Sequence, residues 1–245
     1  MIRTVGSLCS GIGGFENGLE RVGDFQVRWQ VEINPFCIEV LEKHWPTVTR
    51  YQDITTLTGD ELEPVDLICA GFPCQPVSYA SATRKGQNSE KWIWPDIARL
   101  VGRVRPKVVL LENTPGLLTA GEPPGSAFAE VLGDLASHGY DAEWSYISCR
   151  DLGAPHLRVR IFIYASDSNH KSQSGVLVDD GSRASLSQFA NAHQRWKNPL
   201  TSLNRVDDGI SGRVDRLNRL TSLGNSVCPY IIEWIGRRIR AADDK

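Results

Sequence analysis

Cys74 is the residue whose setting most clearly suggests chemistry. It lies between two prolines in the segment 71-GFPCQPVS-78, directly after an apolar run. Because proline fixes φ, Pro73 and Pro76 hold the thiol on a stiff loop, which suits a nucleophile that must meet one defined atom. The alternatives are a buried inert thiol, a redox pair or a metal ligand, but the chain has no C-x-x-C pair and no histidine cluster at zinc-ligand spacing. We interpret the other cysteines as packing residues: Cys9, Cys37, Cys69, Cys149 and Cys228.

A carboxyl group and two guanidinium groups form a second set. Glu112 ends the apolar run 107-KVVLLEN-113, where poor solvation raises the pKa of a carboxyl and lets it donate a proton or a hydrogen bond near neutral pH. Arg158 and Arg160 stand at strand spacing on one face, and arginine suits planar recognition of a base edge or a phosphate. The alternatives are a structural Glu–Arg pair and an ordinary salt-bridged strand.

The turn 10-SGIGGF-15 and Glu32 have the composition of a nucleoside site. Glycines let the backbone pass close to a ligand at a helix N-terminus, and an acidic residue that closes the next strand can hold ribose hydroxyls. NAD, FAD and S-adenosylmethionine would each fit, although the glycine spacing departs from the G-x-G-x-x-G of NAD sites. A tight structural turn with a surface glutamate is the alternative.

The apolar pattern predicts the elements that must position these residues. Strands alternate with helices, which indicates an α/β fold with a mostly parallel sheet covered on both faces. Ligands bind such sheets at the carboxyl ends of the strands, where the residues above all lie. The predicted strands run near 5–8, 26–33, 51–54, 65–71, 107–113, 141–148 and 159–165, and the predicted helices near 15–22, 35–43, 93–104, 126–139 and 229–240.

Charge is unevenly distributed over the 245 residues, although the net charge is only −2. Residues 1–80 hold five Lys/Arg against eleven Asp/Glu, whereas 81–110 hold seven against two and 147–220 hold eleven against seven. Two basic segments suit a protein that meets phosphates on one face; a solvated basic surface is the alternative. Since no run of 18 apolar residues and no signal peptide is present, we expect a cytoplasmic protein without membrane contact.

The order of the motifs resembles that of the cytosine-C5 DNA methyltransferase family. The matching segments are SGIGGF, Glu32, Asp53-Ile54, GFPCQPVS, ENTPGL, PHLRVR and 223-LGNSVCP-229. Thr114 stands where many members have valine, and His156 where many have glutamine. The resemblance implies a Rossmann-like S-adenosylmethionine-dependent methyltransferase domain over 1–165 plus 216–245. It also implies a small irregular target-recognition lobe over 166–215, as in compact phage-type members.

The family resemblance implies a DNA (cytosine-5-)-methyltransferase. Cys74 would attack C6 of a flipped cytosine, Glu112 would bond N3, and Arg160 with Arg158 would lie near O2. A thiolate at C6 makes C5 enamine-like, so that C5 can attack a methyl sulfonium, and the buried base must first leave the duplex. A catalytically inactive DNA-binding homologue and an RNA cytosine-C5 methyltransferase are the alternative functions.

The resemblance also implies the ligands and their contacts. The cofactor is S-adenosylmethionine, with Phe15 at the adenine face, Glu32 at the ribose and Asp53-Ile54 at the adenine edge. Its binding residues are Ser10, Gly11, Gly13, Gly14, Phe15, Glu32, Asp53, Ile54, Pro73, Asn225 and Ser226. The partner is double-stranded DNA, which Ser78, Arg84 and Lys85 would contact. We expect a monomer without a metal ion; the sequence does not specify a target site or a restriction endonuclease partner.

Overall fold

A computed structural model describes residues 2–73, 92–154, 157–169, 175–177, 189 and 221–243. The predicted nucleophile Cys74 and the predicted DNA contacts Ser78, Arg84 and Lys85 therefore lie outside the described residues. Most of the predicted small lobe, 166–215, lies outside them as well, so the division into two lobes stays a prediction.

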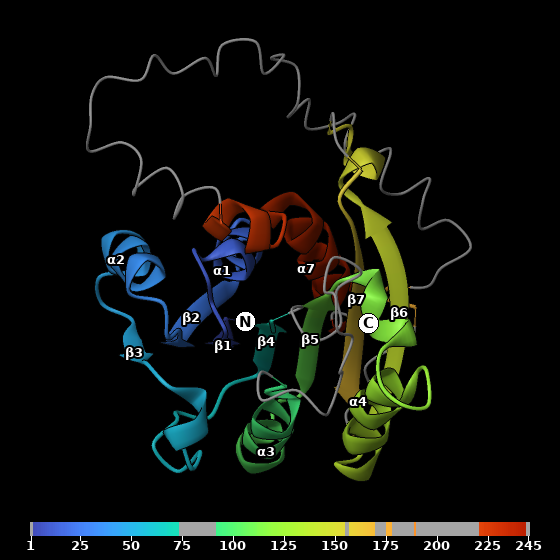
Figure 1. The fold of residues 1–245 in the computed structure, drawn as a ribbon. Coiled ribbons are helices and arrows are strands. Elements are labelled where there is room, and N and C mark those ends of the chain that lie inside the picture. Colours follow the sequence, from blue (N-terminus) through green and yellow to red (C-terminus); the bar gives the residue numbers. More distant parts are fainter. Residues whose placement is uncertain are drawn as a thin grey trace, which may run out of the picture.

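The framework is a seven-stranded sheet in the order β3-β2-β1-β4-β5-β7-β6 (Figure 1). β1 to β5 are parallel, while β7 runs antiparallel to β5 and to β6. The predicted α/β fold is confirmed, with one antiparallel strand because the short β6–β7 connection has no room for a crossover helix. The strands are β1 (Arg3–Leu8), β2 (Phe25–Val31), β3 (Thr49–Tyr51), β4 (Leu67–Gly71), β5 (Val108–Asn113), β6 (Tyr140–Ser148) and β7 (Val159–Asp167).

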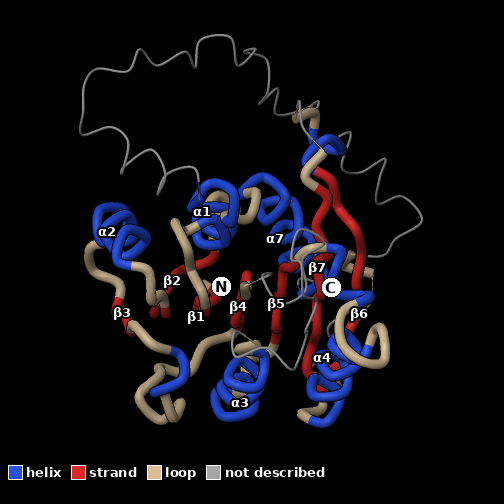
Figure 2. Tube along the Cα trace, viewed as in Figure 1, coloured by secondary structure: helices blue, strands red, loops and turns tan. Residues whose placement is uncertain are grey.

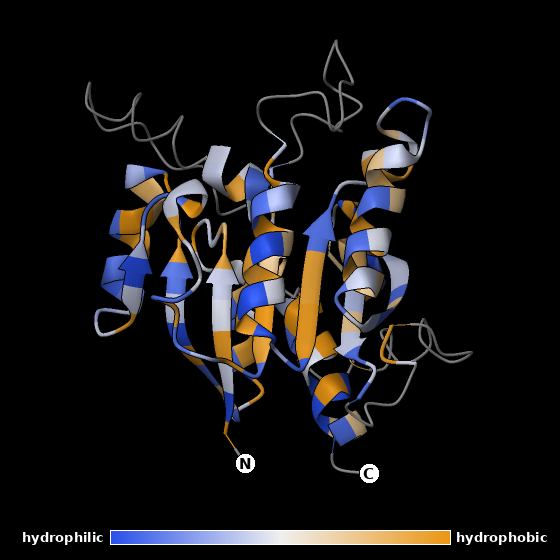
Figure 3. Ribbon diagram, turned by 90° about the horizontal axis from the view of Figure 1, so that it is seen from below, coloured by the Kyte–Doolittle hydropathy of each residue, from blue (hydrophilic) through white to orange (hydrophobic). Residues whose placement is uncertain are grey.

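Helices cover both faces of the sheet, as Figures 1 and 2 show. One face carries α1 (Gly14–Glu20), α2 (Pro35–His44) and α7 (Pro229–Asp243), and the other carries α3 (Trp94–Val104) and α4 (Ser126–Ser137). Each face has its own apolar cluster, with α3 and α4 packed in one and α1 and α7 in the other. Figure 3 shows apolar residues in the strands and on the helix sides turned toward them, which is the arrangement that buries a doubly covered sheet.

Local sequence explains where these helices begin. Asn34 caps α2 by accepting the backbone N–H groups of Phe36 and Cys37, and Pro35 occupies the first helical position. Gly13 precedes α1 with a left-handed φ of 84°, a conformation that glycine adopts without strain. One predicted boundary is wrong: β3 ends at Tyr51, and Ile54–Thr56 form a 3₁₀ turn, η1, because the Asp53 carboxylate accepts the Thr55 N–H and closes a turn instead.

α1 and α7 approach closely, and a glycine makes this possible. A Cβ atom at Gly18 would lie 2.5 Å from Ile232 Cβ and 2.5 Å from the Pro229 carbonyl oxygen. The predicted apolar stripe of α7 includes Ile232 and Ile235, which are fully buried here. α7 therefore packs directly on the helix that follows the glycine-rich turn.

Replacing Gly18 with alanine is expected to lower the free energy of unfolding by about 1–3 kcal/mol, because the added methyl group forces α1 and α7 apart. Gly133→Ala is the matched control, since Gly133 lies in α4 with nothing within 4 Å of the added Cβ; there alanine favours the helix. Urea unfolding of both variants measures the difference. Equal stability of the two variants would contradict the close packing of α1 on α7.

Three residues of the predicted small lobe pack against β6 and α7. The carboxylate of Glu143 on β6 accepts the N–H groups of Gly175 and Leu177 at 2.8 and 2.6 Å. Arg238 on α7 donates to the carbonyl oxygens of Gly175 and Val176 at 2.5 Å each. Val176 and Leu177 are buried. β6 and α7 thus bind residues 175–177 of the segment that follows β7.

Candidate active site

The predicted site residues follow neighbouring parallel strands, so they meet at one edge of the sheet. In the strand register Leu8 pairs with Val31 and with Ala70, and Gly71 pairs with Glu112. The glycine-rich turn after β1, Glu32 after β2 and Glu112 at the end of β5 are therefore side by side. This is the crevice where doubly wound sheets bind ligands.

The glycine-rich turn is shaped for close approach. Gly11 has a φ of 56°, and a Cβ there would have open space around it. A Cβ at Gly13 would lie 2.3 Å from the Trp45 ring, and one at Gly14 would lie 2.7 Å from Val227 and 2.9 Å from Ser226 Oγ. The turn is thus walled on two sides, and its Gly11 backbone is the part left open to a ligand. The C-terminal segment returns to the turn, as the sequence predicted.

Glu32 binds the turn directly. Its Oε2 accepts the Gly11 N–H at 2.7 Å, and its Oε1 accepts the Asn34 N–H at 2.8 Å. The Ser10 N–H also bonds the Val31 carbonyl at 3.0 Å. Each carboxylate oxygen keeps a second lone pair, so Glu32 can accept ribose hydroxyls while it fixes the turn.

Asp53 presents an acceptor two residues after Tyr51, whose carbonyl oxygen accepts the Glu32 N–H. Its Oδ1 accepts the Thr55 N–H at 2.9 Å and the Thr55 hydroxyl at 2.8 Å, and these bonds lower the pKa of Asp53. Ile54 is buried, and Arg99 on α3 donates to its carbonyl oxygen at 3.3 Å. An ionised carboxylate beside a fixed apolar side chain suits the edge and face of an adenine.

Two predicted cofactor residues are turned inward. Phe15 is 3% exposed and belongs to the cluster beneath α1 and α7, so it supports the turn and offers no free ring face. Ser10 Oγ donates to Ser7 Oγ at 3.0 Å and lies in the interior. The backbone of Ser10 is engaged as well, since its N–H bonds the Val31 carbonyl oxygen and its carbonyl oxygen accepts the Gly13 N–H at 3.0 Å each. Of the two C-terminal residues, Asn225 is exposed and Ser226 is half-buried beside Gly14.

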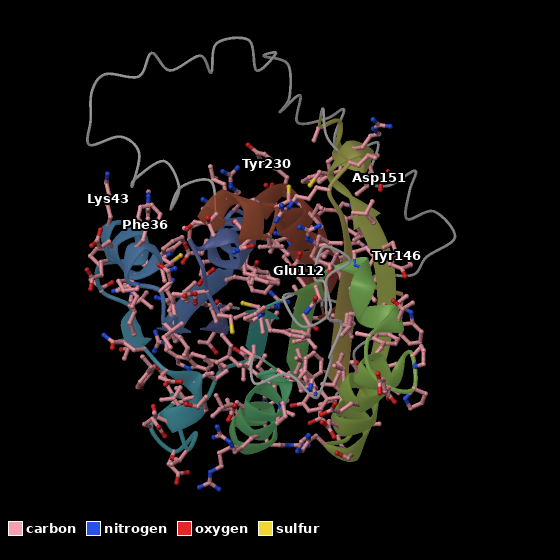
Figure 4. The ribbon with its side chains drawn as sticks, viewed as in Figure 1. Phe36, Lys43, Glu112, Tyr146, Asp151 and Tyr230 are labelled. Carbon is pink, nitrogen blue, oxygen red and sulfur yellow. The ribbon has the colours of Figure 1, made fainter. Side chains whose placement is uncertain are left out.

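Glu112 is a buried acid near the carboxyl end of β5, in the middle of the sheet (Figure 4). It is 5% exposed, and its Oε1 lies 2.9 Å from Arg160 Nε. Among the described residues, this oxygen has no hydrogen-bond partner with good geometry. Burial raises the pKa of Glu112 to about 7, against the opposing charges of Arg160 and Arg158. The carboxyl group is therefore poised between its acid and its base form near neutral pH.

Gly71 joins the cofactor side of the crevice to the acid side. A Cβ there would lie 3.5 Å from Glu112 Oε2 and 3.5 Å from Phe15 Cε2. The glycine-rich turn and the acid are thus separated by little more than one residue. This proximity fits a group transfer between a ligand on the turn and one beside Glu112.

The residues on either side of segment 74–91 contact each other. Phe72 precedes it and packs against Trp92, which follows the undescribed residues 74–91, with ring centroids 5.9 Å apart. Asn113 Nδ2 donates to the Phe72 carbonyl oxygen at 3.3 Å. The Glu-Asn pair was predicted to matter through Glu112; the structure shows that Asn113 also fixes the backbone of Phe72, two residues before Cys74. Pro73, predicted as a cofactor contact, is exposed.

Arg158 binds the returning C-terminal segment. Its Nη1 donates to the Gly224 carbonyl oxygen at 2.8 Å, and its Nη2 donates to the Ser226 carbonyl oxygen. The backbone of Arg158 has a φ of 30°, which is uncommon for a residue with a side chain. The prediction paired Arg158 with Arg160 at the base; in the structure only Arg160 contacts Glu112, and Arg158 binds the returning C-terminal segment.

Arg158→Lys is expected to weaken S-adenosylmethionine binding about tenfold, because one ammonium cannot replace a planar fork on two carbonyl groups. Titration calorimetry with the cofactor measures this, and Arg150→Lys, an exposed site in η4 (Cys149–Leu152), is the matched control. Unchanged cofactor affinity with lost turnover would place Arg158 at the base instead, as the sequence suggested.

The comparisons with known proteins settle the family. The model of the C-5 cytosine-specific DNA methylase family matches residues 3–218. The chain belongs to this family. Type II methyltransferase M.NlaIV of Neisseria lactamica is 30% identical over 65% of this chain and 40% of its own length. Type II methyltransferase M.HgiCII of Herpetosiphon aurantiacus is 35% identical over 64% of this chain and 35% of its own length. The chain thus spans less than half the length of these relatives.

Solved structures share the Rossmann-like methyltransferase fold. A protein encoded within an E. coli prophage matches with a TM-score of 0.70 and 18% identity, over 99% of this chain and 100% of that one. Methyltransferase EhMeth of Entamoeba histolytica matches with a TM-score of 0.64 and 15% identity, over 100% of this chain and 99% of that one.

None of the helices in the described part of the chain has the length and apolar character of a membrane span.

Proposed function

We propose that this protein transfers a methyl group from S-adenosylmethionine to C5 of cytosine in duplex DNA. Membership of the C-5 cytosine-specific DNA methylase family supports the reaction. The observation that carries the proposal is the buried Glu112 carboxyl, which lies 2.9 Å from Arg160 and directly across Gly71 from the glycine-rich turn.

The crevice fits S-adenosylmethionine on its own chemistry. Gly11 leaves space for close approach, Glu32 offers acceptors for ribose hydroxyls, and Asp53 offers one for an exocyclic amine. We propose that Ser226 and Asn225 meet the amino-acid end, since Ser226 lies beside Gly14. When bound there, S-adenosylmethionine supplies a methyl group on a positively charged sulfur.

The protein's own residues then carry the remaining steps. The Cys74 thiolate adds to C6 of the cytosine, which makes C5 electron-rich. Glu112 in its acid form donates to N3 and stabilises the charge that the addition places on the ring. Arg160 holds Glu112 and is within reach of the base O2. After C5 has accepted the methyl group, a base removes the C5 proton, and the electrons of the C–H bond re-form the C5–C6 double bond and expel Cys74.

We further propose that Ser78, Arg84 and Lys85, in the segment next to Cys74, contact the DNA backbone while the base is flipped. The small lobe of 166–215 would contribute to target recognition. The proposed enzyme acts as a monomer without a metal ion, and its proposed place of action is the cytoplasm.

Transfer of label tests the proposal. The protein is incubated with methyl-labelled S-adenosylmethionine and either duplex DNA of mixed sequence or tRNA, and the nucleosides are separated after digestion. We expect label in 5-methylcytosine from DNA with wild type and none with Cys74→Ala. Label in tRNA alone would assign an RNA substrate, and DNA binding without label would indicate an inactive homologue.

A further inference from the structure

Glu16 is a buried carboxyl that the proposed reaction does not use. It lies in the first turn of α1, directly after the glycine-rich turn, and is 0% exposed. Gln30 on β2, which is also 0% exposed, donates its side-chain N–H to Glu16 Oε1 at 3.1 Å. An ionisable group fully inside the protein is costly unless its surroundings satisfy it, so its presence below the cofactor turn needs an explanation.

Gln30 is connected through Arg50 to Trp45, whose ring packs against the glycine-rich turn. Gln30 Oε1 accepts the Arg50 Nε–H at 3.1 Å, and Arg50 Nη2 donates to the carbonyl oxygens of Leu41, at 2.8 Å, and of Trp45, which end α2. The Trp45 ring is the group that a Cβ at Gly13 would meet at 2.3 Å. Arg50 thus satisfies Gln30 and the end of α2, whereas it makes no contact that would neutralise Glu16.

Ser7 and Ser10 connect Glu16 to the start of the turn itself. Ser10 Oγ donates to Ser7 Oγ at 3.0 Å and to the Ser7 carbonyl oxygen at 3.3 Å, and both serines are buried. Their hydroxyls lie against the Glu16 carboxyl. Glu16 Oε2 accepts no hydrogen bond with good geometry from the described residues. An oxygen without a donor but with hydroxyl oxygens beside it fits a protonated acid that donates to them.

The electrostatic surroundings agree with an uncharged group. Burial raises the pKa of Glu16 and outweighs the lowering effect of the polar groups around it, which are its own backbone, Ser7, Gln30 and Ser10. No cation among the described residues contributes to its pKa. The Cys69 thiol, whose pKa burial raises well above its usual range, is a buried neighbour that is itself uncharged.

We propose that Glu16 is a positioning residue, which as an uncharged carboxylic acid links Gln30 on β2 to Ser7 and Ser10 and so fixes the glycine-rich turn for the cofactor. The proposal rests on S-adenosylmethionine binding at this turn, as argued above. Glu16 reaches no ligand itself; it acts through Ser10, whose N–H also bonds Val31 next to Glu32. The network therefore sets the spacing between the turn and the ribose acceptor.

Substitution of Glu16 distinguishes an uncharged hydrogen-bonding role from the alternatives. Glu16→Gln keeps the shape, the acceptor for Gln30 and a donor for the serines, so its cofactor affinity is expected to stay within about threefold of wild type. Glu16→Ala removes the shape, the acceptor and the donor, and is expected to weaken cofactor binding about tenfold or more. At saturating cofactor, kcat is retained, so the loss is confined to KM. Glu39→Gln, an exposed site on α2, is the control.

Titration calorimetry with S-adenosylmethionine and a DNA gel shift give the readouts. Affinity loss in Glu16→Ala with rescue in Glu16→Gln and unchanged DNA binding supports the proposal. Equal loss in both variants would show that a negative charge is required, and full affinity in Glu16→Ala would show no role; either result overturns it. If Glu16→Ala does not fold, Ser10→Ala decides: it removes the hydroxyl through which Glu16 is proposed to act, so it is expected to weaken cofactor binding, and full affinity in this variant would overturn the proposal. Failure of folded wild type to bind the cofactor would instead refute the proposed function.

Discussion

Replacing Cys74 with serine is expected to abolish methyl transfer, by about 10³-fold or more, while cofactor affinity stays unchanged. A serine hydroxyl supplies no appreciable anion at neutral pH, so nothing adds to C6 and C5 stays unreactive. The rate of label transfer to DNA and a calorimetric titration with S-adenosylmethionine measure the two effects separately.

Cys37→Ser is the matched control for this result. Cys37 Sγ lies 3.6 Å from Ser222 Oγ, where a hydroxyl group can take over the contact. This variant is expected to methylate DNA like wild type. If Cys74→Ser instead loses cofactor affinity together with turnover, Cys74 has a structural role, and the proposed attack on C6 is wrong.

Replacing Glu112 with glutamine is expected to lower kcat by about 10²-fold or more, because the amide keeps the shape but cannot transfer a proton. Cofactor affinity should remain, since Glu112 lies across Gly71 from the turn. The pH profile gives a sharper test. The pH profile of wild-type kcat should carry an inflection near pH 7, where Glu112 loses its proton, and this inflection should be absent from the variant.

The same group affects the stability of the fold in a predictable direction. The pKa of Glu112 is raised from 4.5 to about 7 in the folded protein, so its contribution is most favourable below pH 4.5 and declines as pH rises to about 7. At about 1.4 kcal/mol per pKa unit, the loss amounts to about 3 kcal/mol. Urea unfolding between pH 4.5 and 8 should therefore show a flatter profile for Glu112→Gln than for wild type. Parallel profiles would contradict a buried acid.

The framework of the site was predictable because it depends on local patterns. The apolar runs before Gly71 and Glu112 are uniform enough to indicate buried parallel strands, and strand ends of such sheets meet at one edge. The start of α7 at Pro229 followed from proline at a first helical position. The antiparallel direction of β7 was missed, although the short connection between β6 and β7 could have indicated it.

The contacts that refine the site could not be predicted from the sequence, because they join residues distant in the chain. Arg158 and Arg160 have the same spacing whether both reach a base or one turns away, and only the returning Gly224 carbonyl shows which occurs. Phe15 follows the turn as an exposed ring would, yet α7 covers it. The sequence around Glu16 indicates an ordinary helical glutamate, and only the fold brings Gln30 and Ser10 next to it.

Trapping with 5-fluorocytosine tests the central claim most directly. Duplex DNA of mixed sequence, with every cytosine replaced by 5-fluorocytosine, is incubated with the protein and S-adenosylmethionine, and denaturing electrophoresis separates free from linked protein. Fluorine at C5 cannot leave as a proton does, so the enzyme stays bonded to C6. We expect a covalent complex with wild type that requires the cofactor and is absent with Cys74→Ala. A complex that persists in Cys74→Ala, or its absence with folded wild type that binds both ligands, would contradict attack by Cys74.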